Sequence, residues 1–568
     1  MHLIGHYLKP YVRRMSFGLA IKLVGTVMDL LLPYILAHVI DAVAPLRDRG
    51  LIVRWGVLMV VCSILAVTFN ILANRMASSV ARDTTRTLRH DLFARIAWLS
   101  NRQVDTFTVP SLISRMTTDT YNIHRMVGMM QRIGVRAPIL VLGGIAVTMM
   151  LDPVLAAVLV AILPFMALIV FYVSKKSVPL FAESQRAADT MVRVVRENAT
   201  GVRVIKALSK TEDEKKRFTA VNREVMRAEN RANMTMAVSK PVMNFILNGG
   251  LVLVVVVGAH RVNAGQSGAG AITAFLTYFT IILNAMLSVT RVLTMYSQAL
   301  ASAGRIQEVM DAPMQLLPEP RPLRSDGDHL RFEHVTFSYD KKEPTLEDIS
   351  FSLQRGESLG IIGPTGAGKS TVAALLMRFY DVDAGGVYLD GQDVRTMEKT
   401  ALRARFGVVF QNDVLFRNTV GANIRLGRQI SLAELDAAAA DAQAAAFIAG
   451  AGGMDAPVEA KGANFSGGQK QRLLIARALA GRPEFLILDD SSSALDYRTD
   501  AELRGVLREK YAGTTTVIIA QRVSSIQHCD KILVLEDGRM AGFGTHAELL
   551  RSCALYRDIA RLQMGVEA

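Results

Sequence analysis

"SLGIIGPTGAGKS", residues 358–370, decides the fold of the C-terminal part of the chain. A short apolar stretch leads into a glycine-rich turn, and the turn leads into the helix-like run "STVAALLMRFY". The segment from Gly363 to Ser370 fits the spacing G-x-x-x-x-G-K-[ST], in which glycines let backbone N–H groups close around phosphates at a helix N-terminus. Lys369 is expected to reach the β- and γ-phosphates, and the Ser370 hydroxyl to hold Mg²⁺. The stretch predicts a strand–turn–helix unit of a nucleotide-binding α/β domain.

A second apolar run ends in two acidic residues. In "FLILDDSSSALD", residues 485–496, Asp489 follows four apolar residues and Asp490 comes next. A buried strand beside the glycine-rich turn is the usual carrier of a carboxylate that helps to hold Mg²⁺. A purely structural strand suits Phe485 to Leu488, but it does not suit two adjacent acids. Asp489 is therefore predicted to be a ligand of the metal.

The N-terminal part carries long apolar runs. The chain has 568 residues, too many for one hydrophobic core, and its apolar fraction of 51% indicates a membrane portion. A helix needs about 20 apolar residues to cross a bilayer. Six spans are expected, centred on residues 16–40, 55–76, 137–151, 154–173, 242–259 and 269–289. The predicted fold is an all-α polytopic membrane domain of six long helices that extend into the cytoplasm, followed by an α/β ATPase domain.

The positive charge follows the membrane spans. The formal net charge is +14, and the excess of Lys and Arg lies in residues 1–330, whereas residues 331–568 are nearly balanced. Nucleic-acid binding is therefore not expected, because basic residues that flank apolar spans are retained on the cytoplasmic side of a bilayer. The long basic gaps, about 77–136 and 174–241, are predicted to be cytoplasmic. The same rule places both termini and the C-terminal domain in the cytoplasm of a multi-pass protein of the cell membrane.

The two long gaps do not have the composition of loops. Few turn formers interrupt residues 188–208 before Asn198 and Gly201, so the helices are expected to continue out of the membrane and to reverse at short crossing segments. A second reversal is predicted near Pro110, with a new helix from Ser111. Such reversals would dock on a cytosolic domain; solvated helical hairpins are the alternative. Four prolines mark residues 312–329 as a linker between a transmembrane domain, 1–311, and a nucleotide-binding domain, 330–568.

A further motif supplies a family resemblance. "NFSGGQKQR", residues 464–472, resembles the signature of ATP-binding cassette (ABC) proteins. With the glycine-rich turn, the aspartate strand and six spans upstream, the whole chain resembles one half of an ABC exporter. The resemblance implies ATP and Mg²⁺ as cofactors and a partner cassette, with two sites formed between the two cassettes. The implied nucleotide-binding turn comprises Gly363, Pro364, Thr365, Gly366, Ala367, Gly368, Lys369, Ser370 and Thr371.

The resemblance also assigns residues outside that turn. Tyr339 matches the aromatic that stacks on adenine, and Gln411 matches the glutamine that touches the metal beside Ser370 and Asp489. Glu459 resembles an acid that contacts the crossing helices, and Asp496 matches the aspartate of the loop between cassettes. The residues that resemble the signature, and that would bind the γ-phosphate held by the opposite cassette, are Ser466, Gly467, Gly468 and Gln469.

Two positions depart from the family pattern. Asp490 stands where the family carries the glutamate that polarises the attacking water, and Gln521 stands where it carries a switch histidine. Aspartate is one methylene shorter, so its carboxylate would fall about 1.5 Å short of the water. Glutamine can still donate an N–H to the γ-phosphate but cannot be positively charged. The site is predicted to bind ATP and to hydrolyse it slowly.

This combination resembles the degenerate-site subunit of heterodimeric ABC exporters. The expected partner is a second, non-identical half-transporter that carries the glutamate and the histidine, and whose competent site this chain's signature completes. Alternatives are a homodimer with two slow sites and a transporter-fold subunit whose cassette is chiefly regulatory. The expected substrates are amphipathic, drug-like or lipid-like small molecules; a lipid or peptide exporter and a siderophore importer on the same fold stay open.

One ionisable residue lies within a predicted span. Asp29 falls near the centre of the first span, where a charged group is unfavourable unless it faces protein or water. It is a candidate for recognition of a cationic substrate. The alternative is a structural role, in which Asp29 pairs with a polar group on a neighbouring helix.

Overall fold

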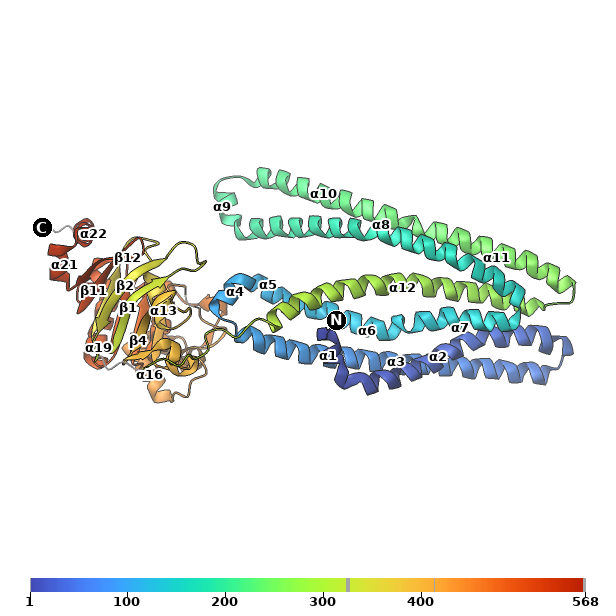
Figure 1. The fold of residues 1–568 in the computed structure, drawn as a ribbon, viewed down its shortest axis with the longest axis horizontal. Helices are drawn as coiled ribbons and strands as arrows, with labels where there is room; N and C mark the ends of the chain where they lie inside the picture. Colours follow the sequence, from blue (N-terminus) through green and yellow to red (C-terminus); the bar gives the residue numbers. More distant parts are fainter. Residues whose placement is uncertain (1, 323–326, 413, 565–568) are drawn as a thin grey trace. The chain divides into compact units, whose positions relative to one another are not determined.

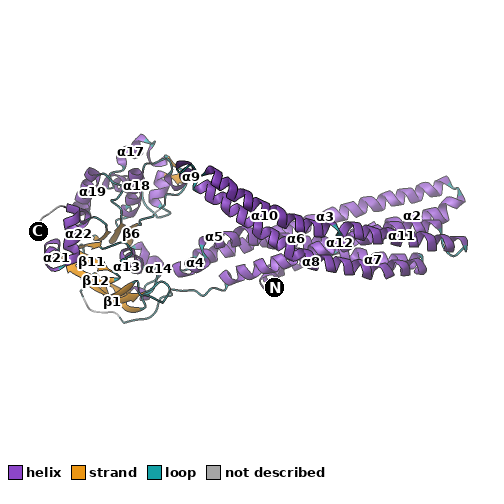
Figure 2. Cartoon of the chain, turned by 90° about the horizontal axis from the view of Figure 1, so that it is seen from above, coloured by secondary structure: helices purple, strands orange, loops and turns teal. Residues whose placement is uncertain are grey.

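The computed structural model describes residues 2–322, 327–412 and 414–564. The chain divides into two compact units, one of Met1–Ala97 with Val109–Ala312 and one of Trp98–Thr108 with Pro313–Ala568. The described part of the first unit is helical, and the strands belong to the second (Figures 1 and 2). The predicted order of a helical membrane domain followed by an α/β domain is confirmed.

The first unit consists of long helices. Within the described residues, six stretches are long and apolar enough to cross a membrane: His2–Leu46, Arg49–Ala97, Val109–Leu151, Pro153–Thr200, Thr211–Asn263 and Ala269–Val289. Each contains one predicted span, so the six predicted spans are confirmed. The α-helices of this unit are α1 (His2–Leu8), α2 (Val12–His38), α3 (Arg49–Ala97), α5 (Val109–Ser114), α6 (Thr120–Met129), α7 (Arg136–Leu151), α8 (Pro153–Thr200), α9 (Val202–Ala207), α10 (Thr211–Ala237), α11 (Ser239–Asn263) and α12 (Ala269–Met310).

A single residue joins α7 to α8. Asp152 is 1% exposed, and one of its oxygens accepts backbone N–H groups of Val154 and Leu155 at 2.9 and 3.3 Å. Its other oxygen accepts from the Arg261 guanidinium on α11 at 2.9 Å. Pro153 occupies the first helical position, where its missing N–H costs no hydrogen bond. Because Asp152 caps α8 and pairs with α11, the hairpin is held by one buried carboxylate.

Long helices leave the apolar region and reverse at short segments. Helix α8 ends at Thr200, α9 begins at Val202, and α10 runs back beside α8 (Figure 1). The predicted reversal at Gly201 is therefore present. At the other reversal α5 begins at Val109 rather than at Ser111, because Pro110 is tolerated within the first turn of a helix.

The reversal between α3 and α5, Trp98–Thr108, belongs to the second unit. Helix α4 (Asn101–Phe107) begins with a capping box between Ser100 and Gln103. The Gln103 amide donates to the carbonyl of Pro313 at 2.8 Å, and Arg102 donates to the carbonyl of Tyr339 at 3.0 Å. These contacts dock α4 on the C-terminal domain, as expected for a crossing segment.

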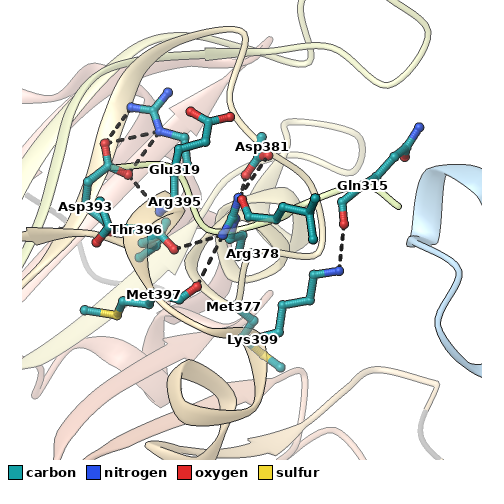
Figure 3. Close-up of polar contacts among 12 residues, drawn as sticks. Gln315, Glu319, Met377, Arg378, Asp381, Asp393, Arg395, Thr396, Met397 and Lys399 are labelled. Carbon is teal, nitrogen blue, oxygen red and sulfur yellow. Dashed lines mark hydrogen bonds and ion pairs between the residues drawn. The ribbon is translucent and has the colours of Figure 1, made fainter. Parts of the chain in front are cut away.

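The proline-rich segment that precedes the domain is also docked on it. Arg378 is fully buried and donates to the Leu317 carbonyl at 2.9 Å and to the Asp381 carboxylate at 2.8 Å. Lys399 donates to the Gln315 carbonyl at 2.8 Å, as Figure 3 shows. The described part of the segment predicted as a linker is therefore fixed to the domain by hydrogen bonds from buried and half-buried cations.

The described part of the second unit is built on two main sheets. One has the order β2-β1-β4-β5 and is antiparallel; the other has the order β12-β11-β3-β10-β9-β6 and is parallel except for β12. The third is a short pair, β7-β8. The strands are β1 (Leu330–Phe337), β2 (Leu346–Leu353), β3 (Ser358–Ile362), β4 (Ala384–Leu389), β5 (Gln392–Asp393), β6 (Phe406–Val409), β7 (Asn418–Thr419), β8 (Pro457–Val458), β9 (Phe485–Asp489), β10 (Thr515–Ile519), β11 (Lys531–Glu536) and β12 (Arg539–Gly544).

Helices pack against the six-stranded sheet, and their buried residues share hydrophobic clusters with its strands. The strand β9, "FLILD", is buried along its whole length, as expected for a central parallel strand. The helices are α13 (Lys369–Leu376), α14 (Lys399–Ala404), α15 (Val420–Arg425), α16 (Leu432–Asp441), α17 (Ala445–Gly450), α18 (Gly467–Leu479), α19 (Tyr497–Lys510), α20 (Val523–Ile526), α21 (His546–Ser552) and α22 (Ala554–Met564).

Candidate functional site

The candidate site lies where parallel strands end. In the register of the sheet Ile519 of β10 faces both Ile361 of β3 and Asp489 of β9, and Val409 of β6 faces Leu488 of β9. The segments that follow these strands therefore emerge at one edge. This carboxyl edge is where open α/β sheets bind ligands.

The glycine-rich turn after β3 has the backbone shape that its sequence predicts. Gly366 and Gly368 have φ angles of +89° and +90°, which side chains disfavour. A Cβ on Gly368 would lie 2.6 Å from Leu346 and 2.9 Å from the Thr345 carbonyl. Lys369 folds back over the turn and donates to the carbonyls of Gly363 and Pro364, each at 2.8 Å. The turn is therefore closed around the N-terminus of α13.

A cavity of about 230 Å³ opens beside this turn. It brings together residues from the glycine-rich turn, from the end of β9 and from the segments after β6 and β10. Its lining residues are Thr345, Thr365, Gly366, Gly368, Lys369, Ser370, Thr371, Gln411, Asp489, Asp490, Ile519, Ala520 and Gln521. Ten of these thirteen are residues that the sequence predicts, so the sheet collects the motifs in one place.

The side chains at the cavity floor suit a hard cation. Asp489 is 5% exposed, its carboxylate accepts the Ser370 hydroxyl, and burial raises its pKa. Gln411 adds an amide oxygen to the same lining. Carboxylate, hydroxyl and amide oxygens are the donors that Mg²⁺ prefers. Asp489, Ser370 and Gln411 would hold the ion, and the ion would neutralise charge on the bound phosphates.

The two departures from the family pattern lie against one another. Asp490 has a φ of +49°, and its backbone N–H donates to the Ile519 carbonyl at 2.9 Å. The Gln521 amide nitrogen lies 3.5 Å from an Asp490 carboxylate oxygen, a long hydrogen bond. Burial raises the pKa of Asp490, and the charges of Arg522 and Lys369 oppose that rise. The short carboxylate thus faces an amide that cannot carry positive charge.

Tyr339 stands next to the glycine-rich turn. Its hydroxyl lies 3.2 Å from the Thr371 hydroxyl, and the residue is 43% exposed. Edge-to-face contacts with Phe337 and Tyr380 hold the ring, with centroids 4.9 and 5.1 Å away. An exposed aromatic face fixed beside a phosphate-binding turn is suited to stack on a nucleobase.

The signature residues do not line this cavity. Among the described residues, Ser466 and Gln469 form a capping box that starts α18, and Ser466 and Gly467 are exposed. Asp496 caps α19, where its carboxylate accepts from Thr499, and Glu459 is likewise exposed. Exposed signature residues remain available to another molecule, as the resemblance implies for a partner cassette.

Several contributors to the site were not predicted. Thr345, Ile519 and Ala520 line the cavity, Tyr380 supports the Tyr339 ring, and Arg522 acts electrostatically on Asp490. None belongs to a spaced motif. Each reaches the site through the packing of strands and helices, for which a single sequence carries no local signal.

Asp29 lies in the first unit, in the wall of a separate cavity. Its carboxylate accepts from the Arg136 guanidinium at 2.8 Å and from the Asn70 amide at 3.2 Å. It therefore has the polar partners on neighbouring helices that the structural alternative expects. A role in substrate recognition stays a prediction.

The fold and site define a class of protein: a membrane domain of six helices fused to a nucleotide-binding cassette. Family models agree. Residues 15–286 match the ABC transporter transmembrane region, and residues 346–493 match the ABC transporter family. The chain belongs to the ABC transporter family.

Individual relatives support this assignment over the full length. An uncharacterized ABC transporter ATP-binding protein of Mycobacterium tuberculosis is 34% identical over 569 residues, covering 99% of this chain and 98% of the relative. A multidrug efflux ATP-binding/permease protein of Mycobacterium bovis is 31% identical over 97% of this chain and 46% of its own length. The structure of a bacterial Atm1-family ABC exporter with ATP bound has a TM-score of 0.83 at 28% identity, covering 98% of this chain and 99% of that chain.

Proposed function

We propose that the chain is one half of a heterodimeric ABC exporter that moves amphipathic small molecules across the cytoplasmic membrane. Its own nucleotide site binds ATP with Mg²⁺ and hydrolyses it slowly. Its signature, Ser466 to Gln469, completes the competent site of a non-identical partner that carries the glutamate and the histidine. ATP bound between two cassettes stabilises their closed arrangement and so shifts the membrane helices between states.

The observation that carries this proposal is the pairing of Asp490 with Gln521 inside an otherwise complete nucleotide cavity. The lysine, the serine and the metal-binding aspartate are all present, so the binding chemistry is retained. What has changed is the pair that would activate water and stabilise the developing anion. Loss of one group that stabilises a transition state costs about 10²- to 10³-fold in rate.

The relatives support a two-part assembly. The Mycobacterium bovis multidrug efflux protein matches this chain over less than half of its own length, which leaves room for a second half-transporter in the same polypeptide. The name of this relative, a multidrug efflux protein, also supports small-molecule efflux as the activity. A homodimer with two slow sites is the alternative.

Hydrolysis by the chain alone tests the proposal. The full chain in lipid nanodiscs should bind ATP but turn it over about a hundredfold more slowly than the complex with its co-expressed partner. Steady-state phosphate release measures both rates, and a Lys369→Ala chain in the same complex reports the contribution of this site. Rapid Mg²⁺-dependent turnover by the chain alone would contradict the heterodimer.

A double substitution tests the cause of the slow site. Asp490→Glu with Gln521→His should restore the missing base and cation, so the number of ATP molecules hydrolysed per closure should rise from one towards two. Single-turnover hydrolysis of radiolabelled ATP in the complex counts them. If turnover stays unchanged while ATP binding is intact, the defect lies in geometry beyond these two residues.

A further inference from the structure

A polar cavity lies among the membrane helices, far in sequence from the nucleotide motifs. Its volume is about 780 Å³, and α2, α3, α12 and the stretch from α6 to α7 line it. Lys22, Asp29, Asn74, Arg132 and Arg136 form its charged and amide wall. Asn284 and Ser288 add uncharged polar groups, and the other lining residues are apolar: Met129, Ile133, Ala137, Leu140, Ile281 and Ala285. The cavity thus offers both charged and apolar side chains to a bound molecule.

The one carboxylate of this cavity is already engaged. Asp29 accepts from Arg136 at 2.8 Å and from Asn70 at 3.2 Å, and the Asp29 and Arg136 side chains are 26% and 42% exposed. A cationic substrate would have to displace Arg136 to reach Asp29. One carboxylate cannot balance the three cations that line the wall with it, so the described lining carries a net positive charge.

The two other cations have only neutral partners among the described residues. Lys22 is 3% exposed and donates to the Asn74 amide oxygen at 3.1 Å. Arg132 lies in the π-helical stretch Met130–Gly134 and donates to the Gly128 carbonyl at 3.0 Å. No carboxylate of the described residues forms an ion pair with either of them. The cavity therefore holds two positive charges in excess.

We propose that this cavity binds the anionic group of the transported molecule, with Lys22 and Arg132 as the binding residues. This substrate class deepens the proposed export function and rests on it. Unpaired charge at membrane depth is unfavourable, and a ligand anion would supply the counter-charge. The apolar lining would take the remainder of the molecule. Substrates are therefore amphiphiles that carry a carboxylate, phosphate or sulfonate.

Binding of three matched probes tests the charge preference directly. The probes are dansyl-labelled alkyl chains of equal length that end in a sulfonate, a trimethylammonium or an alcohol, and the protein is the full chain in phosphatidylcholine nanodiscs. The sulfonate should bind about tenfold more tightly than the other two, because charge-assisted hydrogen bonds are the strong ones. Equal affinities, or a preference for the cation, overturn the inference.

Variants assign the preference to the named residues. Arg132→Gln should weaken sulfonate binding about tenfold and leave the alcohol unchanged, whereas Arg132→Lys should retain most of the affinity. Arg193→Gln makes the same chemical change at an exposed position of α8 and should have no effect. Asp29→Asn should leave sulfonate binding intact or tighten it. Loss of sulfonate binding in Asp29→Asn, or a neutral Arg132→Gln, contradicts the assignment.

Two further experiments identify the source of the bound anion and distinguish the proposed anion site from the proposed export function. Phosphatidylglycerol in the nanodisc will compete with the sulfonate if a lipid headgroup is the natural anion, and will not compete if the ligand is a soluble amphiphile; both results support an anion site. ATP-dependent accumulation of the sulfonate in inverted vesicles tests export itself. Binding without accumulation contradicts the proposed export function, whereas accumulation without anion preference contradicts only this inference.

Discussion

Gly366 and Gly368 have nearly the same positive φ but different surroundings. A Cβ on Gly366 would meet nothing within 4 Å, whereas a Cβ on Gly368 would approach Leu346 to 2.6 Å. The two positions therefore separate backbone strain from steric overlap within one turn. A residue other than glycine in the left-handed region costs about 1–2 kcal/mol.

Substitution by alanine should reveal this difference in ATP affinity. We expect Gly366→Ala to weaken ATP binding about tenfold, through strain alone, and Gly368→Ala to weaken it further. Gly505→Ala on α19, where a Cβ meets nothing within 4 Å, is the matched control. Equilibrium binding of a fluorescent ATP analogue to the full chain measures all three. Equal losses in the two turn variants would show that packing against Leu346 is unimportant.

At this scale the sequence predicts a residue when its role is encoded by spacing. In the turn Gly363–Thr371 the glycines must stand at fixed spacings for the backbone N–H groups to surround a phosphate. The residues of the turn are therefore identified from the sequence without a structure. Asp489 follows from the apolar strand before it. Thr345 and Arg522 could not be found in this way, since they reach the cavity through the pairing and packing of elements distant in sequence.

Helix α4 illustrates how one short element can join two functions. Tyr380 donates to the Asp105 carboxylate at 2.8 Å, and the Tyr380 ring packs edge to face on Tyr339. Burial, followed by the hydrogen bond to Asp105, raises the pKa of Tyr380, so its hydroxyl stays protonated and keeps donating at neutral pH. The candidate adenine-stacking ring is thereby connected to the segment between α3 and α5.

Tyr380→Phe should separate nucleotide binding from its transmission to the membrane helices. The substitution keeps the ring that supports Tyr339 and removes the hydrogen bond to Asp105, so ATP affinity should change less than about twofold. The amount of substrate transported per ATP hydrolysed should fall several-fold. Parallel measurement of ATP binding and vesicle transport tests this, with Tyr388→Phe, in β4, as the control. A large loss of ATP affinity would show that the hydroxyl positions Tyr339 itself.

Helices and turns could be predicted where residues close together in the sequence define them. The lengths of the apolar runs predict six spans, and the described residues contain six stretches of that kind. The start of α5 at Val109 differs from the predicted Ser111 because proline fits the first turn as well as it ends a helix. Gln315 and Leu317 are held within the second unit by hydrogen bonds from Lys399 and Arg378, cations of distant segments that no local pattern indicates.

Across the whole molecule, the distribution of basic residues predicts an orientation that cysteine labelling can test. The three native cysteines, Cys62, Cys529 and Cys553, are buried, so background labelling should be low. Gly265→Cys, between α11 and α12, should react with a membrane-impermeant maleimide from outside intact cells. Ser209→Cys, between α9 and α10, should react only after permeabilisation. The opposite pattern would reverse the proposed orientation and place the cassette outside.

The membership of Trp98–Thr108 in the second unit bears on how recombinant pieces of this protein behave. A soluble fragment that starts at Pro313 keeps every nucleotide motif but loses the Gln103 and Ser100 side chains that bond to Pro313 and Gln315. It also exposes the Tyr339 carbonyl and the Tyr380 hydroxyl, which are hydrogen-bonded to α4 in the full chain. Adding a synthetic peptide of residues 98–108 should raise the melting temperature of such a fragment. An ATPase rate measured without this peptide would describe a cassette that lacks part of its own folded unit.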